Sequence, residues 1–148
     1  MLSIQISDIK DFMSHLLSKD TFDHFYFIEA SIKMGVSYQI QGRINEGFYD
    51  TSVEQTLNRE FCYWKEIRHR IFDIIKGKRL PLSCKIVLGL SKQSISYLIA
   101  HNNSSFREED IEGIYVNILY DPKNLLITTG ISYKNFSLDK SLEYAFDE

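Results

Sequence analysis

The stretch FYFIEASIKMGVSYQIQGRI, residues 25–44, decides the fold class predicted for this chain. Apolar and polar residues alternate along two arms, and Gly35 separates the arms at a turn position. This alternation is typical of an antiparallel hairpin that buries one face and exposes the other. The residues predicted to face the core are Ile28, Ala30, Ile32, Met34, Val36, Tyr38, Ile40 and Ile44.

A short strand and an amphipathic helix precede this hairpin. Residues 3–6 alternate as a strand does, and Ser7 or Asp8 can cap the helix that follows. Apolar residues then recur at the spacing of one helix face, at Ile9, Phe12, Met13, Leu16 and Leu17. The order of elements over residues 1–48 is therefore strand, helix, hairpin.

The second half of the chain repeats this order. Its predicted parts are a strand at 84–90, a helix at 91–101, and strands at 114–120 and 125–133 joined by the turn Asp121–Asn124. We therefore predict an α+β fold with an antiparallel sheet and two pseudo-symmetric βαββ halves, at about 1–48 and 82–138. A loop and a basic helix at 49–81 join the halves, and a C-terminal helix follows Asp139.

This order of elements resembles one domain of the sliding-clamp (processivity-factor) fold. In that fold two such halves pack as pseudo-symmetric sheets backed by helices, so the resemblance implies an approximate two-fold axis here. A clamp directs the outward faces of its helices at DNA, and those faces should be basic. The predicted helices at 9–17 and 91–101 are not notably basic, so DNA sliding does not follow from the resemblance.

The composition is that of one globular domain spanning residues 1–148, because 44% of the residues are hydrophobic and 25% are charged. This apolar content excludes a disordered chain. No apolar run approaches the roughly 20 residues that a membrane helix needs, and the N-terminal residues show no export signal. We therefore expect Cys62 and Cys84 to be free thiols in a reducing cytoplasm.

Nearly the whole chain resembles a family of small proteins of anaerobic Gram-positive bacteria, a domain of unknown function. The stretches that carry the resemblance are Asp8–Met13, Trp64–Arg68, Ile75–Ser83, Thr128–Gly130 and Leu138–Glu143. The resemblance implies a cytoplasmic single-domain protein. It implies no activity, cofactor or catalytic residue.

The charge distribution carries the most specific functional signal. The chain has a net charge of −3, but residues 65–85 hold seven basic and only two acidic side chains. Such a cluster can bind the phosphates of a nucleic acid or an acidic protein surface. We therefore predict a non-enzymatic binding domain whose contact residues are Trp64, Lys65, Arg68, His69, Lys76, Lys78 and Arg79.

Structural explanations compete with this binding hypothesis. The basic residues can form a solvated helix face, stabilise the C-terminus of a helix, or pair with the acidic loop 108–112. Trp64 can stack on a base or a ligand ring. A lone tryptophan more commonly anchors a helix to a sheet.

The rival hypothesis is a small-ligand protein or an enzyme with a pocket between the two halves, where Asp11, His15 or His69 act. Asp11–His15 and Asp20–His24 have the spacing of two metal ligands on a helix, but no third ligand is indicated, so we expect no metal site. No nucleotide-binding or hydrolase motif occurs, and the sequence carries no signal for a cofactor or an oligomeric state. A deep pocket favours the rival, whereas a flat basic face favours the binding domain.

Overall fold

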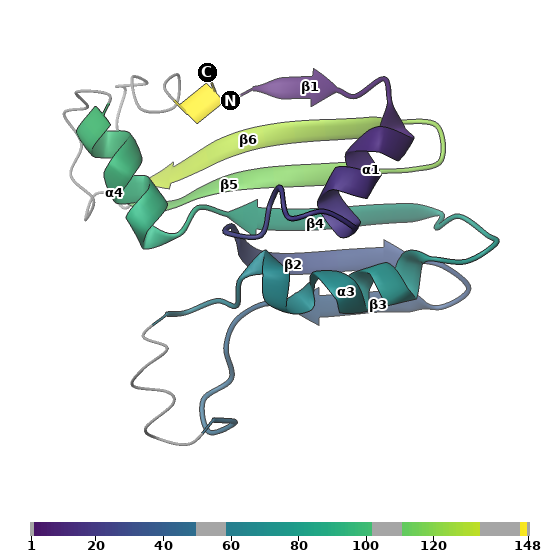
Figure 1. The fold of residues 1–148 in the computed structure, drawn as a ribbon, viewed down its shortest axis with the longest axis horizontal. Helices are drawn as coiled ribbons and strands as arrows, with labels where there is room; N and C mark the ends of the chain where they lie inside the picture. Colours follow the sequence, from purple (N-terminus) through teal and green to yellow (C-terminus); the bar gives the residue numbers. More distant parts are fainter. Residues whose placement is uncertain (1, 50–58, 102–110, 134–145, 148) are drawn as a thin grey trace.

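The computed structural model describes residues 2–49, 59–101, 111–133, 146 and 147. In this part of the chain a six-stranded antiparallel sheet carries three helices, which confirms the α+β class (Figure 1). The strands are β1 (Ser3–Gln5), β2 (Tyr26–Lys33), β3 (Ser37–Gln41), β4 (Ser83–Gly89), β5 (Ile111–Tyr120) and β6 (Leu125–Tyr133). The helices are α1 (Ile9–Leu17), α3 (Trp64–Ile75) and α4 (Lys92–His101).

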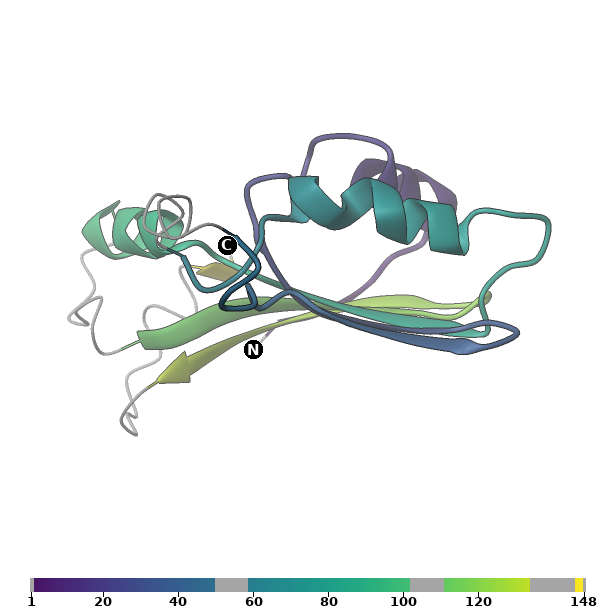
Figure 2. The ribbon, with the colours of Figure 1, turned by 90° about the horizontal axis from the view of Figure 1, so that it is seen from below.

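The helices lie on one side of the sheet, as Figure 2 shows. The main core fills the space between the sheet and the helices α1 and α3, with Leu16, Phe27, Trp64, Ile71 and Ile86 completely buried. A smaller cluster forms where α4 covers the start of β5, and its buried members are Ile95, Ile111 and Ile114. No described helix covers the opposite face of the sheet.

The hairpin of β2 and β3 forms with the predicted alternation over most of its length. Ala30 lies opposite Ile40 and Ile32 lies opposite Tyr38, so these side chains share the face that the helices cover. A β-bulge between Phe27 and Glu29 changes the alternation at the start of β2. The bulge buries Phe27 completely and turns Ile28 to the opposite face, so the prediction of Ile28 as a core residue is wrong.

The strand order β1-β6-β5-β4-β2-β3 does not confirm the clamp-like pseudo-symmetry. β4, the first strand of the second half, lies centrally between β2 and β5. β1, its expected counterpart in the first half, lies at the edge of the sheet and pairs with β6, from the other half. The two strands therefore occupy different places in the sheet, because β1 pairs with β6, the last of the described strands, and not with a strand of its own half.

The predicted C-terminal helix lies mostly outside the described residues. Phe146 and Asp147 are helical, and Phe146 packs against both the main core and the smaller cluster. The predicted basic helix between the halves is confirmed as α3.

Gly42 lies at a point where three segments of backbone meet. Its N–H donates to the carbonyl oxygen of Ile28 at 2.8 Å, and its own carbonyl oxygen accepts from the N–H of Cys62 at 2.9 Å. A Cβ at this position would overlap the backbone carbonyl of Phe27, which cannot move without breaking the sheet. Only glycine fits here.

We expect Gly42→Ala to lower the free energy of unfolding by about 1–3 kcal/mol or more, the usual cost of overpacking. Gly35→Ala is the matched control, because a Cβ at Gly35 meets no atom within 4 Å. The control should change the free energy of unfolding by less than about 0.5 kcal/mol. Urea denaturation measures both variants, and equal stability of the two would contradict the close approach at Gly42.

Candidate functional site

Trp64, the first residue of α3, is completely buried. Its indole N–H donates to the carbonyl oxygen of Leu16 at 2.8 Å, and its ring centroid lies 5.8 Å from that of Phe27. A buried ring with its one polar atom paired anchors a helix and offers nothing to a partner. The prediction of Trp64 as a contact residue is therefore wrong.

Arg68 faces the connection between α1 and β2. Its Nε lies 3.0 Å from Asp23 Oδ1, and its Nη2 donates to Asp23 Oδ2 at 3.2 Å. The two side chains are only 23% and 14% exposed, so this ion pair is largely shielded from water. Arg68 thus holds α3 against the preceding segment, and the structure does not support it as a contact residue.

We expect Arg68→Met to lower the free energy of unfolding by about 1–3 kcal/mol, because it leaves the carboxylate of Asp23 without its partner in a shielded place. Lys65→Met, on the exposed side of the same helix, removes an equal charge and should cost less than about 0.5 kcal/mol. Thermal and urea denaturation compare the two. An equal loss in both variants would show that Arg68 is an ordinary surface residue.

Glu66 organises the N-terminus of α3. Its carboxylate accepts from the backbone N–H of Tyr63 at 3.0 Å and pairs with Arg59, whose guanidinium lies over the Tyr63 ring. Burial acts to raise the pKa of Glu66, but the hydrogen bonds from Arg59 and Tyr63 outweigh it and hold the pKa below its usual value. The charged form of Glu66 is therefore the one that stabilises the fold.

This depressed pKa predicts a pH dependence of stability. Ionised Glu66 stabilises the fold above its pKa in the unfolded chain, about 4.3, and this contribution is lost as the pH falls through the lower folded-state pKa. The difference in free energy of unfolding between the wild type and Glu66→Gln should therefore be largest near neutral pH and shrink below about pH 4. Glu46→Gln, at an exposed position, controls for the loss of one charge. A difference independent of pH would contradict the role of Glu66.

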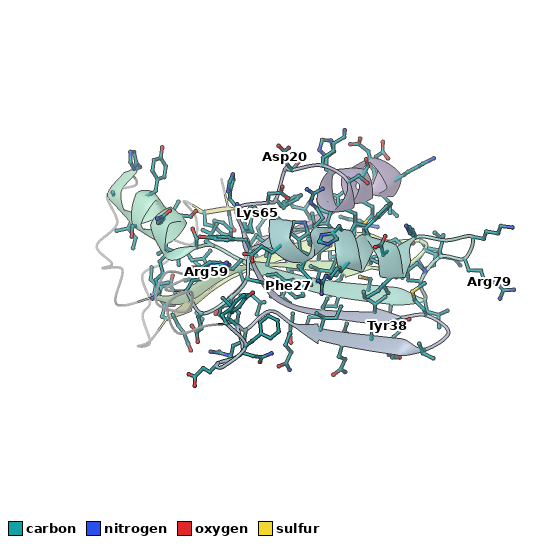
Figure 3. All side chains as sticks on the ribbon, turned by 60° about the horizontal axis from the view of Figure 1, so that its bottom comes forward. Asp20, Phe27, Tyr38, Arg59, Lys65 and Arg79 are labelled. Atoms are coloured by element: carbon teal, nitrogen blue, oxygen red, sulfur yellow. The ribbon has the colours of Figure 1, made fainter. Side chains whose placement is uncertain are left out.

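The other five predicted contact residues lie on the surface. Lys65 and His69 are on the exposed side of α3, and Lys76 pairs with Asp73 at 2.9 Å in the last turn. Lys78 and Arg79 are exposed in the connection to β4. Figure 3 shows Lys65 near the middle of the molecule and Arg79 at one end of it. Lys65 and Lys76 are about 16 Å apart along the helix axis, so the cations form a stripe and not one compact patch.

Exposed apolar side chains accompany Lys78 and Arg79. Leu80 and Leu82 are 66% and 70% exposed, while Pro81 between them is buried. The side chains on either side of the buried proline therefore remain in solvent. This combination of cations and apolar residues was missed by the sequence analysis, although the run Lys78–Leu82 shows it plainly.

Val36 extends this apolar surface across the end of the sheet. The Leu82 N–H donates to the carbonyl oxygen of Lys33 at 2.8 Å, and the Met34 N–H donates to that of Val36 at 3.1 Å, so Leu82 and Val36 flank Met34. Val36 is 65% exposed, although the alternation of the hairpin predicts a core position for it. The reason is that α3 ends before it reaches the end of the sheet where Val36 and Leu82 lie. We call Val36, Lys78, Arg79, Leu80 and Leu82 the basic–apolar end.

Of the residues named in the rival hypothesis, Asp11 and His15 lie together and His69 lies apart, and none of the three lines a hollow between the halves in the described part of the chain. Two hollows span the halves: a cavity of about 60 Å³ lined by Tyr26, Glu112 and Tyr115 among others, and an open groove of about 350 Å³ on the face without helices, lined by Ile28, Lys85 and Tyr115 among others. Typical ligand pockets measure roughly 300–1,000 Å³. Asp11 and His15 line a separate groove of about 390 Å³ along α1, whose lining does not include His69.

The ionisable groups of the described residues form no metal site and include no activated thiol. Within the described ranges, no group of three histidine, cysteine or acidic side chains could hold a metal ion. Cys62 and Cys84 are both free thiols, as expected. Burial raises the pKa of Cys62, and it raises that of Cys84 to about 12, so both thiols are protonated at neutral pH and are poor nucleophiles. The acidic loop proposed to pair with the basic segment lies outside the described residues, apart from Glu112, which accepts from the Ser132 hydroxyl at 2.8 Å.

The model of a family of unknown function, DUF5721, matches residues 15–148, and the chain belongs to this family. This membership confirms the resemblance to a domain of unknown function found in the sequence, and it assigns no activity. No curated protein and no solved structure matches the chain significantly. Among the helices that the structure describes, none has the length and apolar character needed to cross a membrane.

Proposed function

We propose that this protein is a non-enzymatic binding domain of the cytoplasm that contacts an acidic protein surface through its basic–apolar end. The observation that carries the proposal is the exposure of Leu80 and Leu82 directly beside the cations Lys78 and Arg79. Large apolar side chains rimmed by charges mark protein interaction sites. The two free thiols, without a disulfide between them, support a reducing compartment.

Charge and composition favour an acidic protein over a nucleic acid as the partner. A nucleic-acid surface needs several cations close enough to neutralise neighbouring phosphates. Here the stripe along α3 is dispersed, and Lys76 is paired with Asp73. Aliphatic residues such as Leu80, Leu82 and Val36 supply no ring for stacking on bases. They do supply the apolar centre of a protein interface, with Lys78 and Arg79 as its charged rim.

The test uses a fluorescein-labelled synthetic peptide that repeats valine-serine-glutamate-serine, which places valine and glutamate on one face of a strand, with heparin and single-stranded RNA as competitors. Fluorescence anisotropy should show saturable binding that weakens with salt. Lys78→Glu combined with Arg79→Glu should weaken it about tenfold or more, since like charges across an interface cost several kcal/mol. The melting temperature should stay nearly unchanged, because exposed cations contribute only about 0–1 kcal/mol to stability.

The matched control is Lys19→Glu combined with Lys92→Glu, which makes the same charge change at exposed positions outside the basic–apolar end. This control should bind the peptide like the wild type. Equal loss in both double variants would show that only the net charge matters. Binding of RNA or heparin in preference to the peptide would overturn the choice of an acidic protein as partner.

A further inference from the structure

Among the described residues, nothing gives the edge strand β3 the usual protection against pairing with another chain. Within the described part of the chain it pairs only with β2. Its sequence, Ser-Tyr-Gln-Ile-Gln over Ser37–Gln41, contains no charged residue, no proline and no glycine. Natural edge strands usually carry charges, prolines or bulges that prevent the addition of a further strand.

The hydrogen-bonding groups on the free side of β3 follow from its pairing with β2. Val36 accepts from Met34 and Gly42 donates to Ile28, so the even-numbered residues direct their backbone groups toward β2. The odd-numbered residues Ser37, Gln39 and Gln41 therefore direct their N–H and C=O groups toward the free edge. These groups are spaced as an added strand requires.

The core is only partly closed above this edge. Tyr38 is 38% exposed, and Ile40 is half-buried on the face that α3 covers. Ile67 and Ile74 of α3 are also half-buried. We call the residues Tyr38, Ile40, Ile67 and Ile74 the apolar seam. An added strand would cover the apolar seam with those of its side chains that point toward α3. Burial against this surface favours apolar residues at such positions.

Arg70 supplies the charge preference of the seam. Arg68 on α3 faces α1, and two further residues rotate the helix by about 200°, which directs Arg70 to the side away from α1. In Figure 1 that side of α3 is the one toward the β3 edge. Arg70 is exposed and takes part in no ion pair among the described residues. It would favour an acidic residue in the added strand.

A second copy of this chain fits the edge poorly. Pairing of β3 with β3 around Gln39 would join the two sheets, and the two α3 helices would lie on the same face, one on each side of the newly paired strands. Their Arg70 sides would then face each other, and like charges brought together at an interface are unfavourable. Charge complementarity thus favours a different protein with acidic and apolar residues.

We propose that an extended segment of the partner, with both apolar and acidic residues on its side that faces α3, binds by adding a strand to the free edge of β3. This proposal rests on the proposed function, since it describes how the acidic partner is held. Val36 belongs to the basic–apolar end and directly precedes Ser37, so that end and the β3 edge form one continuous surface. Backbone hydrogen bonds would supply affinity, and Arg70, Lys78 and Arg79 would select acidic residues.

Hydrogen exchange measured by NMR tests the mode of binding with the same glutamate–valine peptide. On saturation, the amide protons of Ser37, Gln39 and Gln41 should exchange at least tenfold more slowly, because new hydrogen bonds protect them. The amides of Tyr38 and Ile40 already face β2 and should change much less. Unchanged exchange at the three odd-numbered residues in the saturated complex would overturn strand addition.

Two variants, with one matched control, test the edge directly. Gln39→Pro removes an N–H that faces the free edge, and it should abolish peptide binding, whereas Gln39→Thr keeps the N–H and should bind normally. Arg70→Glu should weaken binding of the glutamate–valine peptide about tenfold or more and strengthen binding of a lysine–valine peptide of the same design, because it replaces one of the three selecting cations with an acid. Arg70→Glu leaves the strand intact, so it decides the question if Gln39→Pro fails to fold.

The outcomes separate this proposal from the proposed function. If Gln39→Pro folds and binds like the wild type while the Lys78/Arg79 double reversal loses binding, strand addition is wrong and the proposed function stands. If the wild type binds no acidic peptide, both are wrong. If the three amides are protected without peptide in a protein that sediments as a dimer, the occupant is a second copy and the proposal is overturned.

Discussion

The buried Trp64 is the contact on which the arrangement of this protein depends. Its ring fills the core beside Phe27, and its N–H bond to Leu16 joins the start of α3 to the end of α1. The Arg68–Asp23 ion pair then fixes the rotation of α3 about its axis. Because one face of the helix is held in this way, its remaining cations have defined directions: Lys65 toward solvent and Arg70 toward the β3 edge.

The surface open to a partner follows from where this helix ends. α3 covers the middle of β2 and β3 but stops at Ile75, so the last row of the sheet, with Val36 and Leu82, has no helical cover. The same end carries Lys78 and Arg79 in the connection to β4. An apolar row, a rim of cations and an unprotected edge strand therefore lie next to one another, which is the combination expected of a docking surface for an extended acidic segment.

Local patterns predicted those parts of the structure that local burial determines. The hairpin register and the apolar face of α1 followed from alternation and helical spacing, because one side of each element meets the core. The bulge beside Phe27 and the pairing of β1 with β6 depend on contacts between distant segments, which leave no periodic signal. The direction of Arg68 depends on Asp23, and the burial of Trp64 depends on Leu16. The charge pattern therefore located the basic segment, but it did not indicate which of its side chains are engaged in contacts within the protein.

The most direct test of this account is an NMR map of the backbone amides perturbed by the glutamate–valine peptide. The account predicts saturable shifts centred on Val36–Gln41 and Lys78–Leu82, with Lys19 and Lys92 unaffected. Shifts centred on the groove lined by Asp11 and His15, or shifts spread evenly over all basic residues, would contradict it.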